Sequence, residues 1–310
     1  MRIVFFGTPE FAVTSLDRLV REGHEIAAVV TMPDKLAGRG HKLLQSDVKK
    51  YAVAHGLPVL QPEKLRDPAF LADLKALDAD IFVVIAFRML PEAVWAMPPR
   101  GTFNLHASLL PRYRGAAPIN RAIMNGETET GVTTFFLDHQ IDTGSIIGRK
   151  AIPISPDDNA GTLHDKLMIL GADMVAETIN ALDKGEVTPM PQPEGEFVPA
   201  PKIFRDDCLI RWNRPAVEIH NQVRGLSPYP AACSSFSDER HGKMDCKVFA
   251  TRVDEKLSDG AKPGSVDISG GKFMVATADR WIEILELQPA GKKRMNASAF
   301  LLGYRPLEML

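Results

Sequence analysis

Asn104 and His106 alternate with the apolar residues Phe103 and Leu105 in a short segment, residues 101–106. The segment predicts a strand, and alternation along a strand would put both side chains on one face, about 6.6 Å apart. An asparagine amide can stabilise an oxygen that gains negative charge, and a histidine can exchange a proton near neutral pH. The pair therefore suits acyl-group chemistry, although a lone histidine at a strand end often only satisfies backbone groups.

Two further segments can meet this strand end. Residues 108–115, SLLPRYRG, are too polar and kinked for a core and predict an ordered surface loop. Residues 138–144, DHQIDTG, follow another predicted strand and can bring Asp142 to the same edge. Asn104, His106 and Asp142 would then form an acid–base centre without a nucleophile, which suits a substrate that supplies its own.

The elements that would position these residues follow an alternating pattern. The sequence predicts strands at 2–6, 25–32, 80–87, 101–106, 132–137 and 145–154, and helices at 10–22, 45–55, 67–77, 162–184 and from about 118. Near-continuous apolar strands separated by helices predict an α/β fold with a mostly parallel sheet covered on both faces. The first strand-to-helix turn, GTPE at 7–10, does not fit GxGxxG and so disfavours a dinucleotide site.

The pattern changes after residue 188. Five prolines between residues 188 and 202 predict a stiff, extended linker. Beyond it, one helix at 213–224 and short strands at 231–236, 247–253, 272–277 and 282–287 predict a small barrel or sandwich. The predicted domains are thus residues 1–188, a linker at 189–204, and residues 205–310.

The composition excludes several classes of protein. The 310 residues are 45% hydrophobic and 25% charged, which excludes wholesale disorder. The longest apolar run, residues 81–87, is far shorter than a membrane-spanning helix. The three cysteines form no CxxC pair, so neither a disulfide framework nor a zinc site is expected. A cytoplasmic protein without a membrane partner is the simplest interpretation.

The net charge of −2 conceals an uneven distribution. Residues 35–50 carry five basic side chains and one acidic one, around a turn-rich AGRG core. Residues 203–310 carry 16 basic and 14 acidic side chains, with the densest basic cluster at 292–294. Such clusters commonly face solvent, but a flexible basic arm could also approach a sugar-phosphate backbone.

Three strings carry a resemblance to a known family: FNLH at 103–106, SLLPRYRG at 108–115 and DHQIDTG at 138–144. They resemble the formyltransferases that use 10-formyltetrahydrofolate. The resemblance runs along nearly the whole chain and includes GTPEFA at 7–12, VVIAFRMLP at 83–91 and RGLSPYPAA at 224–232. PDKLAGRGHKL at 33–43 and LQPAGKKRM at 287–295 favour the members that act on tRNA.

The resemblance implies a Rossmann-like formyltransferase domain followed by an OB-like β-barrel that binds tRNA. It implies 10-formyltetrahydrofolate as co-substrate, initiator methionyl-tRNA as acceptor, no metal, and a monomer. The implied catalytic residues are Asn104, His106 and Asp142. The implied folate-binding residues are Phe87, Arg88, Met89, Leu90, Ser108, Leu109, Leu110, Pro111, Asp138 and Ile141. The implied tRNA-binding residues are Arg39, Lys42, Lys292 and Lys293.

Two alternative functions remain open. A formyltransferase that acts on a nucleotide-sugar or a purine-pathway amine would share the catalytic residues, but it would not need the basic segment at 35–50. A tRNA-binding module without activity would not need Asn104, His106 and Asp142 together. An assay that offers methionyl-tRNA and small amines separates these possibilities.

Overall fold

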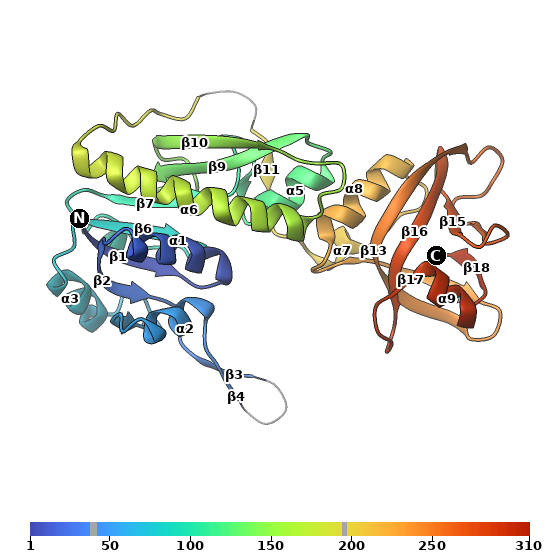
Figure 1. The fold of residues 1–310 in the computed structure, drawn as a ribbon, viewed down its shortest axis with the longest axis horizontal. Coiled ribbons are helices and arrows are strands. Elements are labelled where there is room, and N and C mark those ends of the chain that lie inside the picture. Colours follow the sequence, from blue (N-terminus) through green and yellow to red (C-terminus); the bar gives the residue numbers. More distant parts are fainter. Residues whose placement is uncertain (38–41, 194–196) are drawn as a thin grey trace. The chain divides into compact units, whose positions relative to one another are not determined.

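The computed structural model describes residues 1–37, 42–193 and 197–310. They form two compact units that are interleaved in sequence (Figure 1). The first unit comprises Met1–Gly115, Thr130–Ile152 and His164–Pro199. The second comprises Ala116–Glu129, Pro153–Leu163 and Ala200–Leu310. The sequence did not indicate that 116–129 and 153–163 would group with the C-terminal residues, because this grouping depends on tertiary contacts.

The first unit is built on a mixed sheet in the order β10-β9-β7-β6-β1-β2-β5. The pairs from β7 through β6, β1 and β2 to β5 are parallel, and β9 is antiparallel to β7. β6 is buried along its whole length, as expected for a central strand covered on both faces. The predicted, mostly parallel sheet is therefore confirmed. The strands are β1 (Arg2–Gly7), β2 (Glu25–Val30), β5 (Val59–Leu60), β6 (Ile81–Ile85), β7 (Thr102–His106), β9 (Glu129–Phe136) and β10 (Ile146–Pro153).

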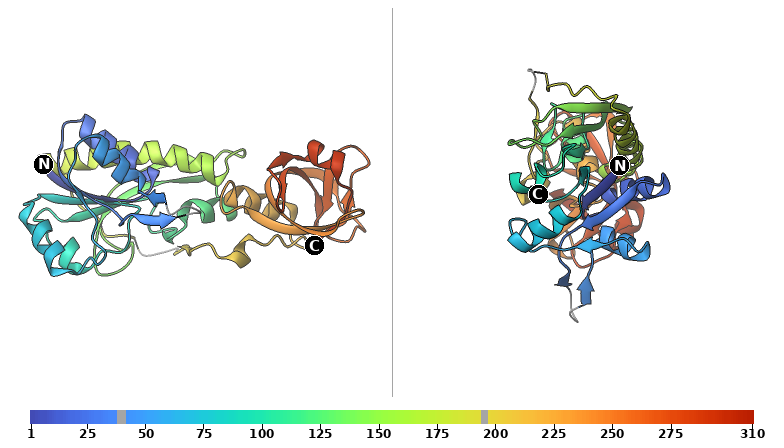
Figure 2. Two further views of the ribbon diagram at one scale, coloured as in Figure 1. Left: turned by 90° about the horizontal axis from the view of Figure 1, so that it is seen from below. Right: turned by 90° about the vertical axis from the view of Figure 1, so that its left-hand side faces the viewer.

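Helices cover both faces of this sheet, with α1 and α6 on one face and α3 on the other (Figure 2). Local capping sets where two of the helices begin: Ser46 accepts from the backbone N–H of Lys49, and Asp67 from that of Ala69. The elements outside the sheet are α1 (Glu10–Arg21), α2 (Asp47–Ala54), α3 (Pro68–Ala76), α4 (Glu92–Trp95) and α6 (Ala160–Lys184), and the short strands β3 (Lys35–Ala37), β4 (Lys42–Leu44), β8 (Arg114–Gly115) and β11 (Pro199–Ala200).

The second unit contains an antiparallel sheet in the order β14-β15-β16-β13-β12-β18. A bridge between Ser265 and Glu308 brings the two ends of this order together, so the sheet forms a nearly closed barrel. Gly264 makes this closure possible, because a Cβ there would lie 2.4 Å from the carbonyl oxygen of Met309. The strands are β12 (Ala232–Asp238), β13 (Gly242–Leu257), β14 (Val266–Asp267), β15 (Phe273–Ala276), β16 (Arg280–Pro289), β17 (Met295–Asn296) and β18 (Pro306–Met309).

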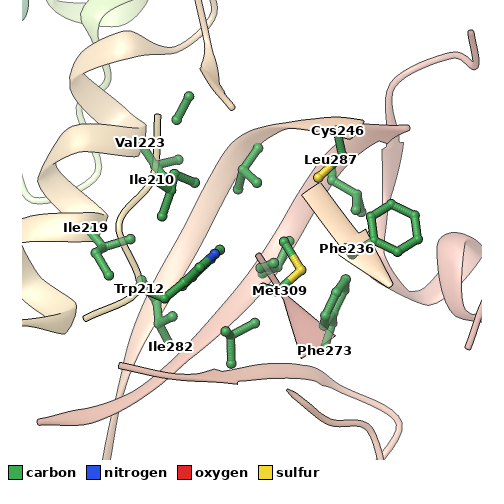
Figure 3. Packing of buried hydrophobic residues seen from close by; sticks show 14 of the residues in the cluster. Ile210, Trp212, Ile219, Val223, Phe236, Cys246, Phe273, Ile282, Leu287 and Met309 are labelled. Carbon is green, nitrogen blue, oxygen red and sulfur yellow. The ribbon is translucent and has the colours of Figure 1, made fainter. Parts of the chain in front are cut away.

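The barrel encloses an apolar core in which Phe236, Phe273 and Leu287 are fully buried (Figure 3). Trp212 lies against this core, and its indole N–H donates to the hydroxyl of Ser234 at 3.0 Å. The four predicted strands are confirmed as β12, β13, β15 and β16, whereas the last helix and the last strand of the chain were not predicted. The helices of the unit are α5 (Pro118–Met124), α7 (Arg205–Cys208), α8 (Ala216–Leu226) and α9 (Ala297–Gly303).

Candidate active site

Asn104 lies near the carboxyl end of β7, between the parallel strand β6 and the antiparallel strand β9. Its side-chain oxygen, Oδ1, is buried and has no hydrogen-bond partner among the described residues. Leaving a buried polar atom unpaired costs free energy, so such an atom is a place where a bound donor would stabilise the structure. Asn104 Oδ1 is therefore suited to accept a hydrogen bond from a ligand.

The orientation of the His106 ring is set by the loop that follows β7. Nε2 of His106 lies 2.8 Å from the carbonyl oxygen of Tyr113. A carbonyl oxygen only accepts hydrogen bonds, so Nε2 carries a hydrogen and donates it. Nδ1 is then the nitrogen free to gain or lose a proton, and it lies 3.9 Å from Oδ2 of Asp142. That distance is too long for a hydrogen bond but short enough for a charge on the ring to be stabilised by the carboxylate.

Asp142 is held by its own loop and by the one opposite. Its Oδ2 accepts from the backbone N–H of Gly115 at 2.9 Å. The φ of Asp142 is 57°, in the left-handed region that residues other than glycine adopt infrequently. The loop ends at Gly144. A Cβ on this residue would lie 1.7 Å from the carbonyl oxygen of Phe136, so only a glycine fits here. The structure thus brings Asn104, His106 and Asp142 to one edge of the sheet, as the sequence predicted.

The loop after His106 is fixed by buried hydrogen bonds. The hydroxyl of Ser108 donates to the carbonyl of Arg112 at 2.7 Å. The hydroxyl of Thr133 on β9 accepts a hydrogen bond from the backbone N–H of Leu110 at 3.1 Å and donates one to the carbonyl oxygen of Ser108 at 2.7 Å. Ser108 and Leu110 are fully buried, whereas Leu109 and Pro111 are half-buried. The first two side chains therefore support the loop.

The segment after β6 combines buried and exposed apolar side chains. Phe87 packs edge-on against Phe6 at 5.7 Å, and Leu90 is buried. Arg88 donates to the carbonyl oxygen of Glu63 at 2.8 Å and to that of Pro62, and burial lowers the pKa of its guanidinium. Met89 is 73% exposed. Met89 therefore has the most exposed side chain of residues 87–90.

The loop at 138–144 is stabilised by hydrogen bonds to the carboxylate of Asp138, a residue of the same loop. Asp138 Oδ1 accepts from the backbone N–H of Gln140 at 2.9 Å and from the hydroxyl of Thr143 at 2.7 Å. Ile141 is 62% exposed. His139 packs edge-on against Trp95, with the ring centroids 5.2 Å apart. Its bulk is therefore accommodated against α4.

The structure describes only some of the predicted tRNA-binding residues. Arg39 lies outside the described residues, and Lys42 begins β4 without a described side chain. Lys292 and Lys293 are exposed in the turn between β16 and β17, and neither has an ion-pair partner within the described ranges. Arg294, in contrast, pairs with Glu286 and lies over a neighbouring ring. Two free lysines thus remain from the basic cluster.

A cavity of about 690 Å³ lies in the second unit and not at the Asn104–His106 centre. Arg205, Arg211 and Lys247 line it, together with apolar side chains such as Leu209 and Ile210. The two arginines have no acidic partner among the residues that the structure describes. These cations could not be predicted as a group from the sequence, because they are dispersed along the chain and only the fold brings them together.

Two properties of the described residues bear on the class of protein. No helix in the described ranges is long and apolar enough to cross a bilayer. No group of three His, Cys, Asp or Glu side chains in those ranges is arranged to hold a metal ion. The three cysteines are free thiols, two of them buried.

Comparison with known proteins places the chain in a family. The family model described as "Formyl transferase" matches residues 1–179, and "Formyl transferase, C-terminal domain" matches residues 202–305. The methionyl-tRNA formyltransferase of Bacteroides fragilis is 51% identical over 99% of this chain and 96% of its own length. The chain belongs to the formyl transferase family. The relative of the same name from Flavobacterium johnsoniae is 48% identical over 98% of this chain and 96% of its own length.

Solved structures confirm the fold of this formyl transferase. HypX from Aquifex aeolicus, in complex with tetrahydrofolic acid, matches 98% of the chain with a TM-score of 0.65 and 19% identity. The chain spans about half of HypX, 47% of its length. The N-formyltransferase from Helicobacter canadensis, in complex with folinic acid and dTDP-3-aminofucose, matches 91% of this chain and 98% of its own with a TM-score of 0.66 and 21% identity.

Proposed function

We propose that this formyl transferase moves a formyl group from 10-formyltetrahydrofolate to the free amino group of methionine on initiator methionyl-tRNA. The arrangement of Asn104, His106 and Asp142 carries the proposal, because it supplies an amide, a basic nitrogen and a carboxylate at one strand end. The similarity to methionyl-tRNA formyltransferases over nearly the full chain supports this acceptor. The folates named with two structural neighbours support the donor.

The folate would be held by the segments at 87–90, 108–111 and 138–141. The exposed side chains of Met89 and Ile141 provide apolar surface for a flat ring system. The unpaired Oδ1 of Asn104 fits a reacting group that carries an N–H. Ser108, Leu110 and Asp138 would act indirectly, because their polar groups or side chains are already used within the two loops. When bound, the folate supplies the activated formyl group.

The residues of the centre have separate roles in the proposed transfer. The amide Nδ2 of Asn104 donates to the formyl oxygen as negative charge develops there. Its Oδ1 accepts from the attacking amine and so orients the nitrogen lone pair toward the formyl carbon. Nδ1 of His106 takes up the proton that the amine loses, because Nε2 is already donating to Tyr113. Asp142 stabilises the resulting positive charge on the ring across 3.9 Å. The His106 ring then gives this proton to the folate nitrogen as the bond between that nitrogen and the formyl carbon breaks, so that tetrahydrofolate leaves as a neutral amine.

The tRNA would be bound by basic residues from two parts of the chain. Lys292 and Lys293 are free to contact phosphates, since neither is paired with a carboxylate in the described structure. Arg39 and Lys42 belong to the basic segment at 35–50 and are proposed for the acceptor end. Phosphate contacts of this kind would make binding strongly dependent on salt. The enzyme is proposed to act as a monomer.

A competition assay tests the proposed function. The full chain is given 10-formyltetrahydrofolate with equal amounts of initiator methionyl-tRNA, a dTDP-linked amino sugar and glycinamide ribonucleotide. The proposal predicts formyl transfer to the tRNA-bound methionine, with transfer to the small amines at least about 100-fold slower per molar amount. Preferential formylation of a small amine, or binding of the tRNA without transfer, would overturn it.

A further inference from the structure

The proline-rich segment after α6 is hydrogen-bonded to the candidate active site. Met190 forms an antiparallel bridge with Ile146, with N···O distances of 2.7 and 2.9 Å. Further along, the carbonyl oxygen of Val198 accepts from the backbone N–H of Tyr113 at 2.6 Å. This part of the chain therefore does more than link two domains.

Gln192 makes the most specific contact in this segment. Its Nε2 lies 2.8 Å from the carbonyl oxygen of Asp142 and 3.0 Å from that of Gly144. Its Oε1 accepts from Nε of Arg114 at 3.1 Å and from a second nitrogen of the same guanidinium. Carbonyl oxygens only accept and a guanidinium only donates, so the amide can satisfy all these partners in one orientation alone.

These bonds join the two loops that flank His106. Arg114 belongs to the loop that accepts from Nε2 of His106 through Tyr113. Asp142 belongs to the loop that faces Nδ1. A second link runs parallel to the first, because the N–H of Gly115, next to Arg114, donates to the Asp142 carboxylate at 2.9 Å. Gln192 and Gly115 thus hold the backbone and the side chain of Asp142, respectively.

The backbone of Asp142 needs such support. Its φ of 57° lies in the left-handed region, which costs free energy even though aspartate tolerates it better than most residues, so contacts from neighbouring groups stabilise this conformation. If the carbonyl of Asp142 loses its donor, the residue can relax toward negative φ, and its carboxylate moves away from His106. A misplacement of about 1 Å at a catalytic group can cost about 100-fold in rate.

We propose that Gln192 is a positioning residue for the formyl transfer, acting through Asp142. It holds the strained backbone of Asp142 so that the carboxylate stays opposite Nδ1 of His106. This inference rests on the proposed function, since the reaction it supports is the one assigned to that centre. Gln192 itself is not required to touch either substrate.

Steady-state formylation by the full chain tests the inference with Gln192→Ala and Gln192→Met. The methionine variant keeps the approximate size of the side chain without its hydrogen bonds, so a packing defect is distinguished from lost positioning. We expect both to lower kcat by about 10-fold or more, with KM for methionyl-tRNA within about twofold of wild type. Met190→Ala is the matched control and should leave kcat unchanged, because its exposed side chain takes no part in the bridge.

The decisive readout is the combination with Asp142→Ala. If Gln192 acts through Asp142, Gln192→Met should have no further effect on kcat in the Asp142→Ala background. An equal fall in kcat in both backgrounds would overturn the inference, as would wild-type kcat in Gln192→Met. Absence of formyl transfer by the unsubstituted protein is a different result, since it would contradict the proposed function itself.

Discussion

Nε2 of His106 donates to the carbonyl oxygen of Tyr113 across 2.8 Å, and this one bond determines which ring nitrogen is available for chemistry. Nδ1 is left facing Oδ2 of Asp142 at 3.9 Å. A proton gained by the ring at Nδ1 would therefore create an imidazolium beside a carboxylate that is buried enough for the attraction to be felt. The loop between residues 107 and 115 thus determines the role of the histidine.

Replacement of His106 by glutamine separates two functions of the ring: the hydrogen bond that Nε2 donates to Tyr113 and the exchange of a proton at Nδ1. A glutamine amide can still donate to Tyr113, but it has no basic nitrogen in place of Nδ1. We expect His106→Gln to remain folded and to lose about 100-fold or more in kcat. Steady-state formylation measures the change, with His164→Gln on α6 as control. A kcat within twofold of wild type would show that no proton is exchanged at Nδ1.

Gly144 is predicted to be irreplaceable in the Asp142 loop. A Cβ at this position would overlap the carbonyl oxygen of Phe136 at 1.7 Å, so the backbone must move before any side chain fits. Gly144→Ala should lower the free energy of unfolding by about 2 kcal/mol or more and also reduce kcat. Chemical denaturation with a parallel activity assay provides both values. Gly270→Ala, with open space around its Cβ, is the control and should change neither. Full stability of Gly144→Ala would mean that the loop is not constrained as described.

His220 on α8 provides a pH-dependent test of the second unit. Burial, with a smaller contribution from nearby Arg224, lowers the pKa of His220 below its usual 6.5. Above pH 6.5 the ring is neutral in both the folded and the unfolded chain. Below that value the unfolded chain takes up the proton first, so stability falls as the pH drops from 6.5 toward the folded-state pKa.

We therefore expect His220→Gln to lose less stability than wild type between pH 7 and pH 5. A glutamine can keep the bond that His220 makes to the hydroxyl of Thr251, at 3.0 Å in the wild type. Urea unfolding of both proteins across this range gives the comparison. Curves that stay parallel at every pH would show that His220 titrates normally in the folded protein.

The two free lysines after β16 should determine part of the tRNA affinity. Reversing both charges in Lys292→Glu/Lys293→Glu should raise the Kd for initiator tRNA by about 10-fold or more and reduce the salt dependence of log K by roughly 2. Lys243→Glu/Lys272→Glu changes the net charge equally at exposed positions elsewhere in the second unit and serves as control. Equal weakening by both pairs would indicate a general charge effect and not contacts made by Lys292 and Lys293.

The sequence predicts the first unit well because its signals are local. Buried parallel strands are continuous apolar runs, and the turn at Gly7 and the caps at Ser46 and Asp67 mark helix starts within a few residues. The proximity of His106 and Asp142 was also predictable, since His106 ends one strand and Asp142 follows another strand of the same sheet. The same periodicities predicted the α/β class and the barrel, and the structure confirms both.

What the sequence could not provide depends on contacts between distant residues. Five prolines indicate an extended segment, but they do not show that Gln192 reaches the carbonyl of Asp142, 50 residues away. Barrel closure depends in the same way on Gly264 accommodating Met309. Arg205, Arg211 and Lys247 line one cavity although no charge run marks them in the sequence.

Single-turnover formylation tests the central assignment most directly. The full chain, saturated with initiator methionyl-tRNA, is mixed with 10-formyltetrahydrofolate, and the appearance of N-formylmethionine on the tRNA is followed in time. We predict transfer by the wild type, slower transfer to elongator methionyl-tRNA, and a rate constant lowered about 100-fold or more in Asn104→Ala with tRNA binding retained. A wild type that leaves methionyl-tRNA unmodified, or an Asn104→Ala variant that transfers at the wild-type rate, would contradict the assignment.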